Sequence, residues 1–181
     1  MEGARGSVVP RRAGLDRRWA LQVLAGIALY VLLGNARSVQ PNPFIPGAII
    51  AVNMVVPVVA GIVLGRAAGF LVGVLGTLGN ALSPAGSIFE WLAIAPHGLM
   101  GLVAGHVRER AATPVLAASL LVGHLLNLAL FVSFGALQPA VLRRPGLWYG
   151  LGYEALVGIM SVTVLVGVYR LALEPPEATW P

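Results

Sequence analysis

Ionisable and amide side chains are embedded in a chain that is otherwise strongly apolar. Apolar residues make up 57% of its 181 residues and charged residues 10%, and the mean hydropathy is +0.84. Within or at the ends of the apolar runs lie Glu90, His97, His124, Asn127 and Glu154. Because such groups are costly inside a lipid bilayer, they indicate a functional site. Two carboxylates suit a ligand that carries positive charge or several hydrogen-bond donors, and histidine and asparagine can fix its orientation in an apolar cavity.

The elements that must position these residues are long apolar segments. A helix needs about 20 residues to cross the hydrocarbon layer of a membrane. We therefore predict an all-α, polytopic membrane protein with six transmembrane helices, at residues 19–36, 47–65, 67–83, 88–107, 113–137 and 150–173. A basic tail at 1–18 precedes this single membrane domain of residues 19–173, and a short tail at 174–181 follows it.

Two of the six segments have an alternative interpretation. The third is short and rich in glycine, so it could form a re-entrant half-span instead of a full crossing. The first follows a basic stretch and contains an apolar core at residues 19–33, which is also the pattern of a secretory signal peptide. If the third segment were not a full span, the orientation argued next would change.

Arginine positions orient the helices. All twelve basic residues are arginine; nine of them fall on the side of the amino-terminal tail, whereas Arg37, Arg143 and Arg144 fall on the other side. By the positive-inside rule, we expect both termini to lie in the cytoplasm. We therefore expect the protein to span the cytoplasmic membrane. Arginines that are scattered between apolar runs serve as topology signals, so we do not expect nucleic acid as a partner.

This topology brings polar residues of several helices together in the outer half of the membrane. His97, for example, lies seven residues, or nearly two helical turns, below Glu90. Tryptophan and tyrosine faces suit a flat or cationic ring, so a small aromatic nutrient fits the set. The predicted substrate-binding residues are Asn53, Asn80, Glu90, Trp91, His97, His124, Asn127, Trp148, Tyr149, Tyr153 and Glu154.

Several of these residues have simpler explanations. Trp91, Trp148 and Tyr149 could belong to an interfacial aromatic belt. Glu90 and Glu154 could be carboxylates at helix starts, where the helix dipole favours them. His124 and Asn127 could be a hydrogen-bonding pair between helices.

Small residues recur at spacings that let membrane helices approach closely. Glycines four residues apart end the second segment, open the third and close the fourth. We expect most of them to pack the bundle and a minority to form a surface for another membrane protein. The candidate partner-binding residues are Ala25, Gly26, Ala28, Gly61, Gly65 and Gly69.

Residues 49–110 carry a family resemblance. The blocks VLGRAAGFLVGVLGTLGNAL and APHGLMGLVAGHVRER, separated by an outer loop, resemble the S components of energy-coupling factor (ECF) vitamin transporters. The resemblance implies a six-helix subunit that captures a micronutrient from outside. It also implies two kinds of partner: a transmembrane coupling subunit, the T component, and a pair of cytoplasmic ATPases.

The resemblance has one departure and leaves the substrate open. Ala25 and Ala28 are three residues apart, whereas family members commonly place two alanines four apart to contact the coupling subunit. The nickel and cobalt members have an amino-terminal Met-His motif, which Glu2 excludes. The order of Glu90-Trp91, His124, Trp148 and Tyr153 is similar to that of thiamin-binding members. Thiamin, its pyrimidine moiety or another nitrogen-rich ring is the leading substrate, with riboflavin, queuosine-type bases and other vitamins as alternatives.

We predict neither a catalytic site nor a cofactor. The chain contains no lysine and therefore no phosphate-binding glycine loop, so ATP hydrolysis would have to come from partners. The rival hypotheses are an intramembrane metal enzyme that uses Glu90, His97 and His124, a membrane sensor or scaffold without a ligand, and a facilitator that works without ATPases.

Overall fold

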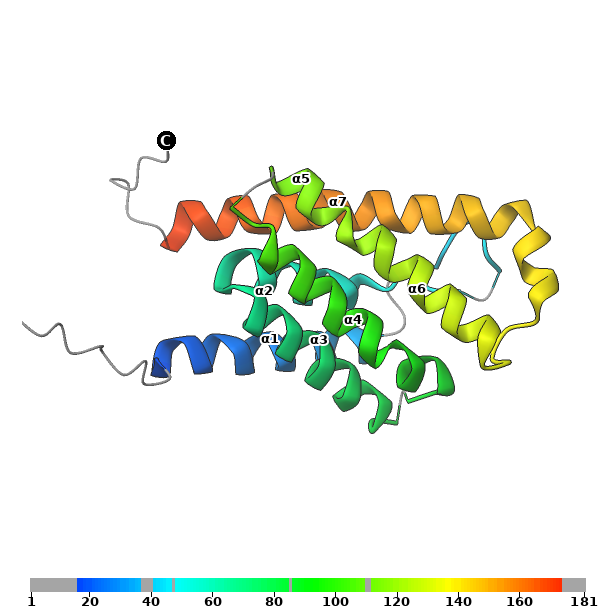
Figure 1. The fold of residues 1–181 in the computed structure, drawn as a ribbon, viewed down its shortest axis with the longest axis horizontal. Coiled ribbons are helices and arrows are strands. Elements are labelled where there is room, and N and C mark those ends of the chain that lie inside the picture. The colour runs from blue at the N-terminus through cyan, green and yellow to red at the C-terminus, as the bar shows by residue number, and fades with distance from the viewer. Residues whose placement is uncertain (1–15, 37–40, 47, 85, 110–111, 174–181) are drawn as a thin grey trace, which may run out of the picture.

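The computed structural model describes residues 16–36, 41–46, 48–84, 86–109 and 112–173, which form a bundle of helices (Figure 1). The prediction of an all-α protein is confirmed: the described residues form no β-strand and only an isolated bridge between Pro41 and Ile49. The elements are α1 (Arg17–Asn35), the 3-10 turn η1 (Val52–Met54), α2 (Val55–Leu64), α3 (Arg66–Ala81), α4 (Ile88–His106), α5 (Thr113–Ala117), α6 (Ser119–Ser133), the 3-10 turn η2 (Pro139–Arg143) and α7 (Pro145–Leu173).

Four helical stretches are long and apolar enough to cross a membrane. They are Arg17–Asn35, Ile88–His106, Thr113–Ser133 and Pro145–Ala172. The predicted second and third segments are shorter, at Val52–Leu64 and at the 16 residues of α3.

The bounds of three segments differ from the prediction for local reasons. The second helix begins at η1 because residues 41–46 and 48–51 form an irregular loop. The fifth ends at Ser133, just before Gly135 with its φ of 72°. The last begins at Pro145, a residue whose fixed φ and missing N–H suit the first position of a helix.

Successive helical segments alternate in direction. The start of α1, the α2–α3 turn and the end of α7 lie at one end of the bundle, and the α3–α4 connection and the start of α7 lie at the other (Figure 1). The first end carries the arginines at helix termini, namely Arg17, Arg18, Arg66, Arg108 and Arg170. We call it the arginine-rich end. Of the described arginines, only Arg143 and Arg144 lie at the opposite end.

Helices α2, α3 and α4 meet through glycine. A Cβ atom added to Gly101 of α4 would lie less than 3.0 Å from the carbonyl oxygen of Gly69 of α3, and one added to Gly61 of α2 would be as close to the carbonyl of Gly101. Further along, Gly73 faces the carbonyl of His97 in the same way. Because no side chain fits between these backbones, the three helices gain dispersion contacts that lipid cannot replace. We call this contact the glycine seam.

The seam bears on the candidate partner-binding residues. Gly61 and Gly69 are buried inside the chain, so they pack the bundle and offer no surface to a partner. Gly65 forms the sharp α2–α3 turn with a φ of 98°, which favours glycine. Gly26 is half-buried against Val72. Only Ala25 and Ala28 are exposed, and their contact with a partner stays a prediction.

The glycine seam predicts that Gly101→Ala destabilises the protein. The added methyl group would meet the backbone of Gly69, and such overpacking costs about 1–3 kcal/mol. Thermal unfolding of the purified protein in detergent measures the effect. The matched control is Gly167→Ala on α7, where an added Cβ meets nothing within 4 Å. Equal stability of the two variants would contradict the seam.

Candidate functional site

His97 is the centre of a buried polar network that joins four helices. Its Nδ1 lies 2.5 Å from the hydroxyl of Tyr30 on α1 and 2.9 Å from the hydroxyl of Thr77 on α3. Its Nε2 lies 3.1 Å from the amide of Asn127 on α6. All four side chains are at least nine-tenths buried. The network therefore ties α1, α3, α4 and α6 together deep inside the bundle.

A neutral imidazole satisfies both ring nitrogens of His97. The amide nitrogen of Asn127 faces Nε2, so Nε2 accepts this hydrogen bond and the imidazole proton lies on Nδ1. Thr77 donates to the carbonyl oxygen of Gly73 on its own helix at 2.6 Å, which leaves its hydroxyl oxygen, 2.9 Å from Nδ1, as an acceptor. Among the described residues, Oδ1 of Asn127 has no partner.

A second set of contacts fastens the loop before η1 to the start of α7. Glu154 of α7 accepts a hydrogen bond of 2.5 Å from the backbone N–H of Ala51. Asn42 donates to the carbonyl oxygen of Gly150 at 3.2 Å and accepts from the N–H of Phe44 at 3.0 Å. Aromatic contacts of Phe44 with Tyr149 and Tyr153, with ring centroids 6.1 and 5.9 Å apart, cover the outside of this joint. The loop is thus held across the end of the bundle opposite the arginine-rich end.

Beneath this loop lies a hollow of about 340 Å³, which we call the ligand hollow. Its polar side chains are Asn53 on η1, Glu90 in the first turn of α4 and Ser161 on α7. The rest of the lining is aliphatic or glycine, from Leu33, Gly34, Ala36, Ile49, Ile50, Ala51, Val52 and Val157. A mostly apolar cavity with a few placed polar groups is the usual form of a small-molecule site.

His124 and Glu154 line a separate, much smaller cavity beside the ligand hollow. It measures about 10 Å³, which is room for roughly one water molecule. The two cavities share the segment from Ile50 to Val52, together with Val157 and Ser161. Glu154 therefore shapes the wall of the ligand hollow through Ala51, and does not line the hollow itself.

The structure places the predicted substrate residues in five different settings. Asn53 and Glu90 come together in the ligand hollow, and His124 and Glu154 lie beside it. His97 and Asn127 belong to the buried network. Asn80 is 1% exposed and accepts from the Asn35 amide at 3.2 Å. The remaining four, Trp91, Trp148, Tyr149 and Tyr153, are exposed and line neither cavity.

Sequence reasoning missed Tyr30, Thr77 and Ser161. Tyr30 is the one hydroxyl-bearing aromatic residue in the first apolar run, a signal that could have pointed to a buried hydrogen bond. Thr77 and Ser161 carry no such signal, because hydroxyls in membrane helices commonly bond to their own backbone. Ser161 does so, donating to the carbonyl oxygen of Val157 at 2.8 Å.

The proposed metal triad of the rival enzyme hypothesis is not assembled. The described part of the chain contains no group of three histidine, cysteine, aspartate or glutamate side chains that could hold a metal ion. His97 faces hydroxyls and an amide through both of its ring nitrogens. Its surroundings therefore suit a structural hydrogen-bond network.

A comparison with models of known protein families identifies the family of this chain. A family model described as the S component of the ECF-type riboflavin transporter matches residues 21–145. The chain belongs to this family. It is therefore an ECF S component. Members of this family are components of membrane transporters, and the family is not one of enzymes. No curated protein and no solved structure matches the chain.

The buried network predicts different costs for two substitutions in this S component. Tyr30→Phe leaves Nδ1 of His97 beside Thr77, so we expect a loss of about 1 kcal/mol. His97→Leu leaves the amide nitrogen of Asn127 without its partner in an apolar interior, at a cost of roughly 1–3 kcal/mol, and leaves the Tyr30 hydroxyl with Thr77 alone. Thermal unfolding in detergent compares them, and a larger loss for Tyr30→Phe would contradict the central place of His97.

Proposed function

We propose that this S component captures a flat, nitrogen-rich heterocyclic nutrient in the ligand hollow and delivers it to an ECF-type importer. The observation that carries the proposal is the ligand hollow itself, about 340 Å³ in volume, with Asn53, Glu90 and Ser161 as its polar side chains. The family match supports the transport role. The loop fastened by Glu154 and Asn42 covers the hollow.

The proposed orientation has six spans, with both termini in the cytoplasm and the ligand hollow facing outside. The alternating directions of the helical segments support it (Figure 1). So does the division of the described arginines, five at the arginine-rich end and two at the other. The two short helices, α2 and α3, are shielded from lipid on the side where the glycine seam joins them to α4. Because this side of α2 and α3 does not face lipid, the two helices can be shorter than a transmembrane helix that lipid surrounds on all sides.

The leading substrate is riboflavin or a related flavin. The family description names riboflavin. A flavin has a neutral ring system and a side chain with several hydroxyl groups, and carboxylate and amide oxygens such as those of Glu90 and Asn53 accept hydrogen bonds from hydroxyls. The aliphatic lining would bury the ring.

Thiamin is the second candidate. The carboxylate of Glu90 in the ligand hollow favours it, because thiamin carries a positive charge. However, no aromatic side chain lines the hollow, and the tryptophans on which the thiamin prediction depended are exposed. Cation–π capture therefore has no support within the hollow, and we place thiamin after a flavin.

The proposed partners are a T component and two cytoplasmic ATPases, which would supply the energy for release inward. The family match supports this assembly. Ala25 and Ala28, exposed on α1, are the proposed contacts with the T component.

Glu90→Ala should weaken ligand binding. Loss of a hydrogen bond to a charged group costs about 1.5–3 kcal/mol, or roughly a 10- to 150-fold rise in Kd. Quenching of flavin fluorescence by the purified protein measures riboflavin, and calorimetry measures thiamin. The control is Glu109→Ala, whose carboxylate is exposed near the arginine-rich end. Unchanged affinity in Glu90→Ala would remove Glu90 from the site, and binding of neither ligand to the unaltered protein would remove both substrates.

The orientation can be tested with single cysteines, because the chain has none of its own. Arg144→Cys should react with a membrane-impermeant maleimide on intact cells, since it lies at the end that we place outside. Arg66→Cys, at the α2–α3 turn, should react only after the cells are opened. The reverse pattern would contradict the proposed orientation, and external labelling of both positions would contradict a cytoplasmic α2–α3 turn.

A further inference from the structure

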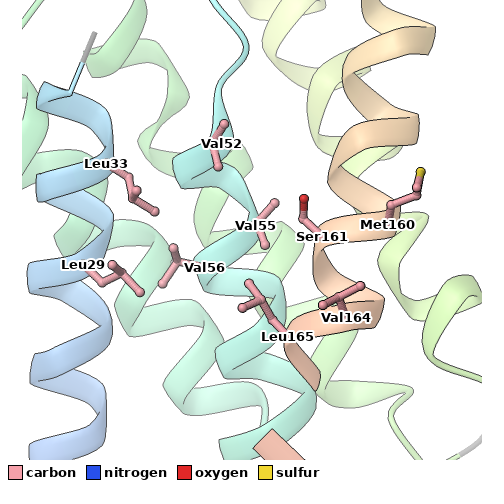
Figure 2. Close-up of a pocket in the computed structure, with 9 residues that line it drawn as sticks. All are labelled: Leu29, Leu33, Val52, Val55, Val56, Met160, Ser161, Val164 and Leu165. Atoms are coloured by element: carbon pink, nitrogen blue, oxygen red, sulfur yellow. The ribbon is translucent and has the colours of Figure 1, made fainter. Parts of the chain in front are cut away.

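A second, larger cavity opens on the side of the bundle between α1 and α7. It measures about 380 Å³. Figure 2 shows α1 and α7 as its two walls and the start of α2 as its floor. We call this cavity the lateral groove; its lining is Leu29, Leu33, Val52, Val55, Val56, Met160, Ser161, Val164 and Leu165.

The lateral groove lies toward the end that we place outside. Leu29 and Leu33 belong to the last two turns of α1, and Val52 opens η1. Near the arginine-rich end, by contrast, the two walls are tied together, since Gln22 of α1 donates to the hydroxyl of Tyr169 of α7 at 3.2 Å. In the described residues of α1 and α7, this side-chain hydrogen bond joins the walls near the arginine-rich end, and the groove occupies the opposite half of the span.

The lining matches a hydrocarbon chain. Ser161 is its one polar side chain, and the Ser161 hydroxyl already donates to the carbonyl oxygen of Val157. The floor residues Val55 and Val56 are 4% and 7% exposed, whereas Val164 and Met160 on the rim are 62% and 60% exposed. Met160 has a flexible side chain that adapts to an irregular neighbour. The groove therefore presents a closed apolar floor and an open rim to the bilayer.

Its chemistry selects among apolar occupants. Helices associate in a membrane through small residues and interhelical hydrogen bonds. The lining of the lateral groove contains neither glycine nor alanine, and its one hydroxyl is already bonded to a carbonyl of its own helix. A lipid acyl chain needs neither feature and can lie along the groove.

The lateral groove also adjoins the ligand hollow. Leu33, Val52 and Ser161 line both cavities. These shared side chains are the partition between the lipid-facing groove and the cavity that contains Glu90 and Asn53. A molecule that fills the lateral groove therefore lies directly behind the wall of the ligand hollow.

We propose that an acyl chain of an outer-leaflet lipid binds in the lateral groove and closes the lateral wall of the ligand hollow. The closing of the wall rests on the function proposed above, because it takes the hollow as the ligand site. Binding of the chain in the groove does not, although its assignment to the outer leaflet uses the orientation proposed there. The ligand chemistry is a linear hydrocarbon chain supplied by the bilayer.

The test uses photoreactive lipid. The full chain is placed in nanodiscs of dioleoylphosphatidylcholine that contain a small fraction of phosphatidylcholine with a diazirine in the middle of one acyl chain. After illumination, peptide mass spectrometry locates the labelled residues. We expect residues 29–33 and 160–165 to carry at least about three times the label of residues 121–125 on α6. That control segment is similarly exposed, with Leu121 at 42% and Val122 at 56%, and lies outside the groove.

A matched pair of variants separates groove binding from general contact with lipid. Val164→Trp fills the groove and should lower its labelling at least threefold. Val168→Trp, one turn away on α7 and 56% exposed, lies outside the groove and should leave the labelling unchanged.

Labelling that follows exposure alone, with no excess in the groove, would overturn the proposal. So would labelling of the groove below that of the control segment, as expected if a second copy of the chain covered it, or equal labelling in the two tryptophan variants. The measurement contains no nutrient, so its failure would leave the proposed riboflavin or thiamin binding untouched. Failure of both nutrients to bind would not change the labelling.

Discussion

Lipid offers no hydrogen-bond partner, and this constraint explains how the buried polar side chains that join the helices are arranged. The buried histidine at position 97 meets two hydroxyls and an amide, each from a different helix. The carboxylate of Glu154 accepts a hydrogen bond from the backbone N–H of Ala51, which the loop before η1 would otherwise leave unpaired. These contacts fix the relative positions of α1, α3, α4 and α6 on one side, and of the loop and α7 on the other. The ligand hollow lies between the two sets, with α1, α4, η1 and α7 all contributing to its lining.

The glycine seam supplies the rigidity that such a site needs. Backbones of α2, α3 and α4 approach so closely that no side chain fits between them, so these three helices form one unit. Asn53, in η1 directly before α2, and Glu90, in the first turn of α4, lie at the end of this unit opposite the arginine-rich end. By contrast, α1 and α7 are tied together near the arginine-rich end and leave the lateral groove between them toward the opposite end. A rigid centre flanked by two less closely packed helices would allow a ligand site to adjust on the side that faces lipid.

Much of the fold could be predicted from the sequence, because apolar runs, prolines and glycines act locally. The helix that starts at Ile88 and the glycine pairs that join α2 to α4 follow directly from such patterns. The split among the polar residues could not be predicted in this way. Helical spacing places His97 on the face of Glu90, but it cannot tell that Tyr30 and Thr77 from other helices would engage its imidazole. Likewise, aromatic residues at a helix start are compatible with a ligand site or with an interfacial belt. The path of the loop before η1, which places Phe44 against Tyr149 and Tyr153, puts these two tyrosines outside the ligand hollow.

The central claim is that side chains from separate helices gather beneath the loop before η1 to hold a small molecule. An experimental structure of the protein purified with riboflavin tests this most directly. The account predicts density for the ligand in the hollow, within hydrogen-bonding distance of Asn53 and Glu90 and enclosed by the aliphatic residues of α1, η1 and α7. Ligand bound instead on the exposed aromatic residues around Tyr149, with the hollow filled by the protein's own side chains, would contradict it.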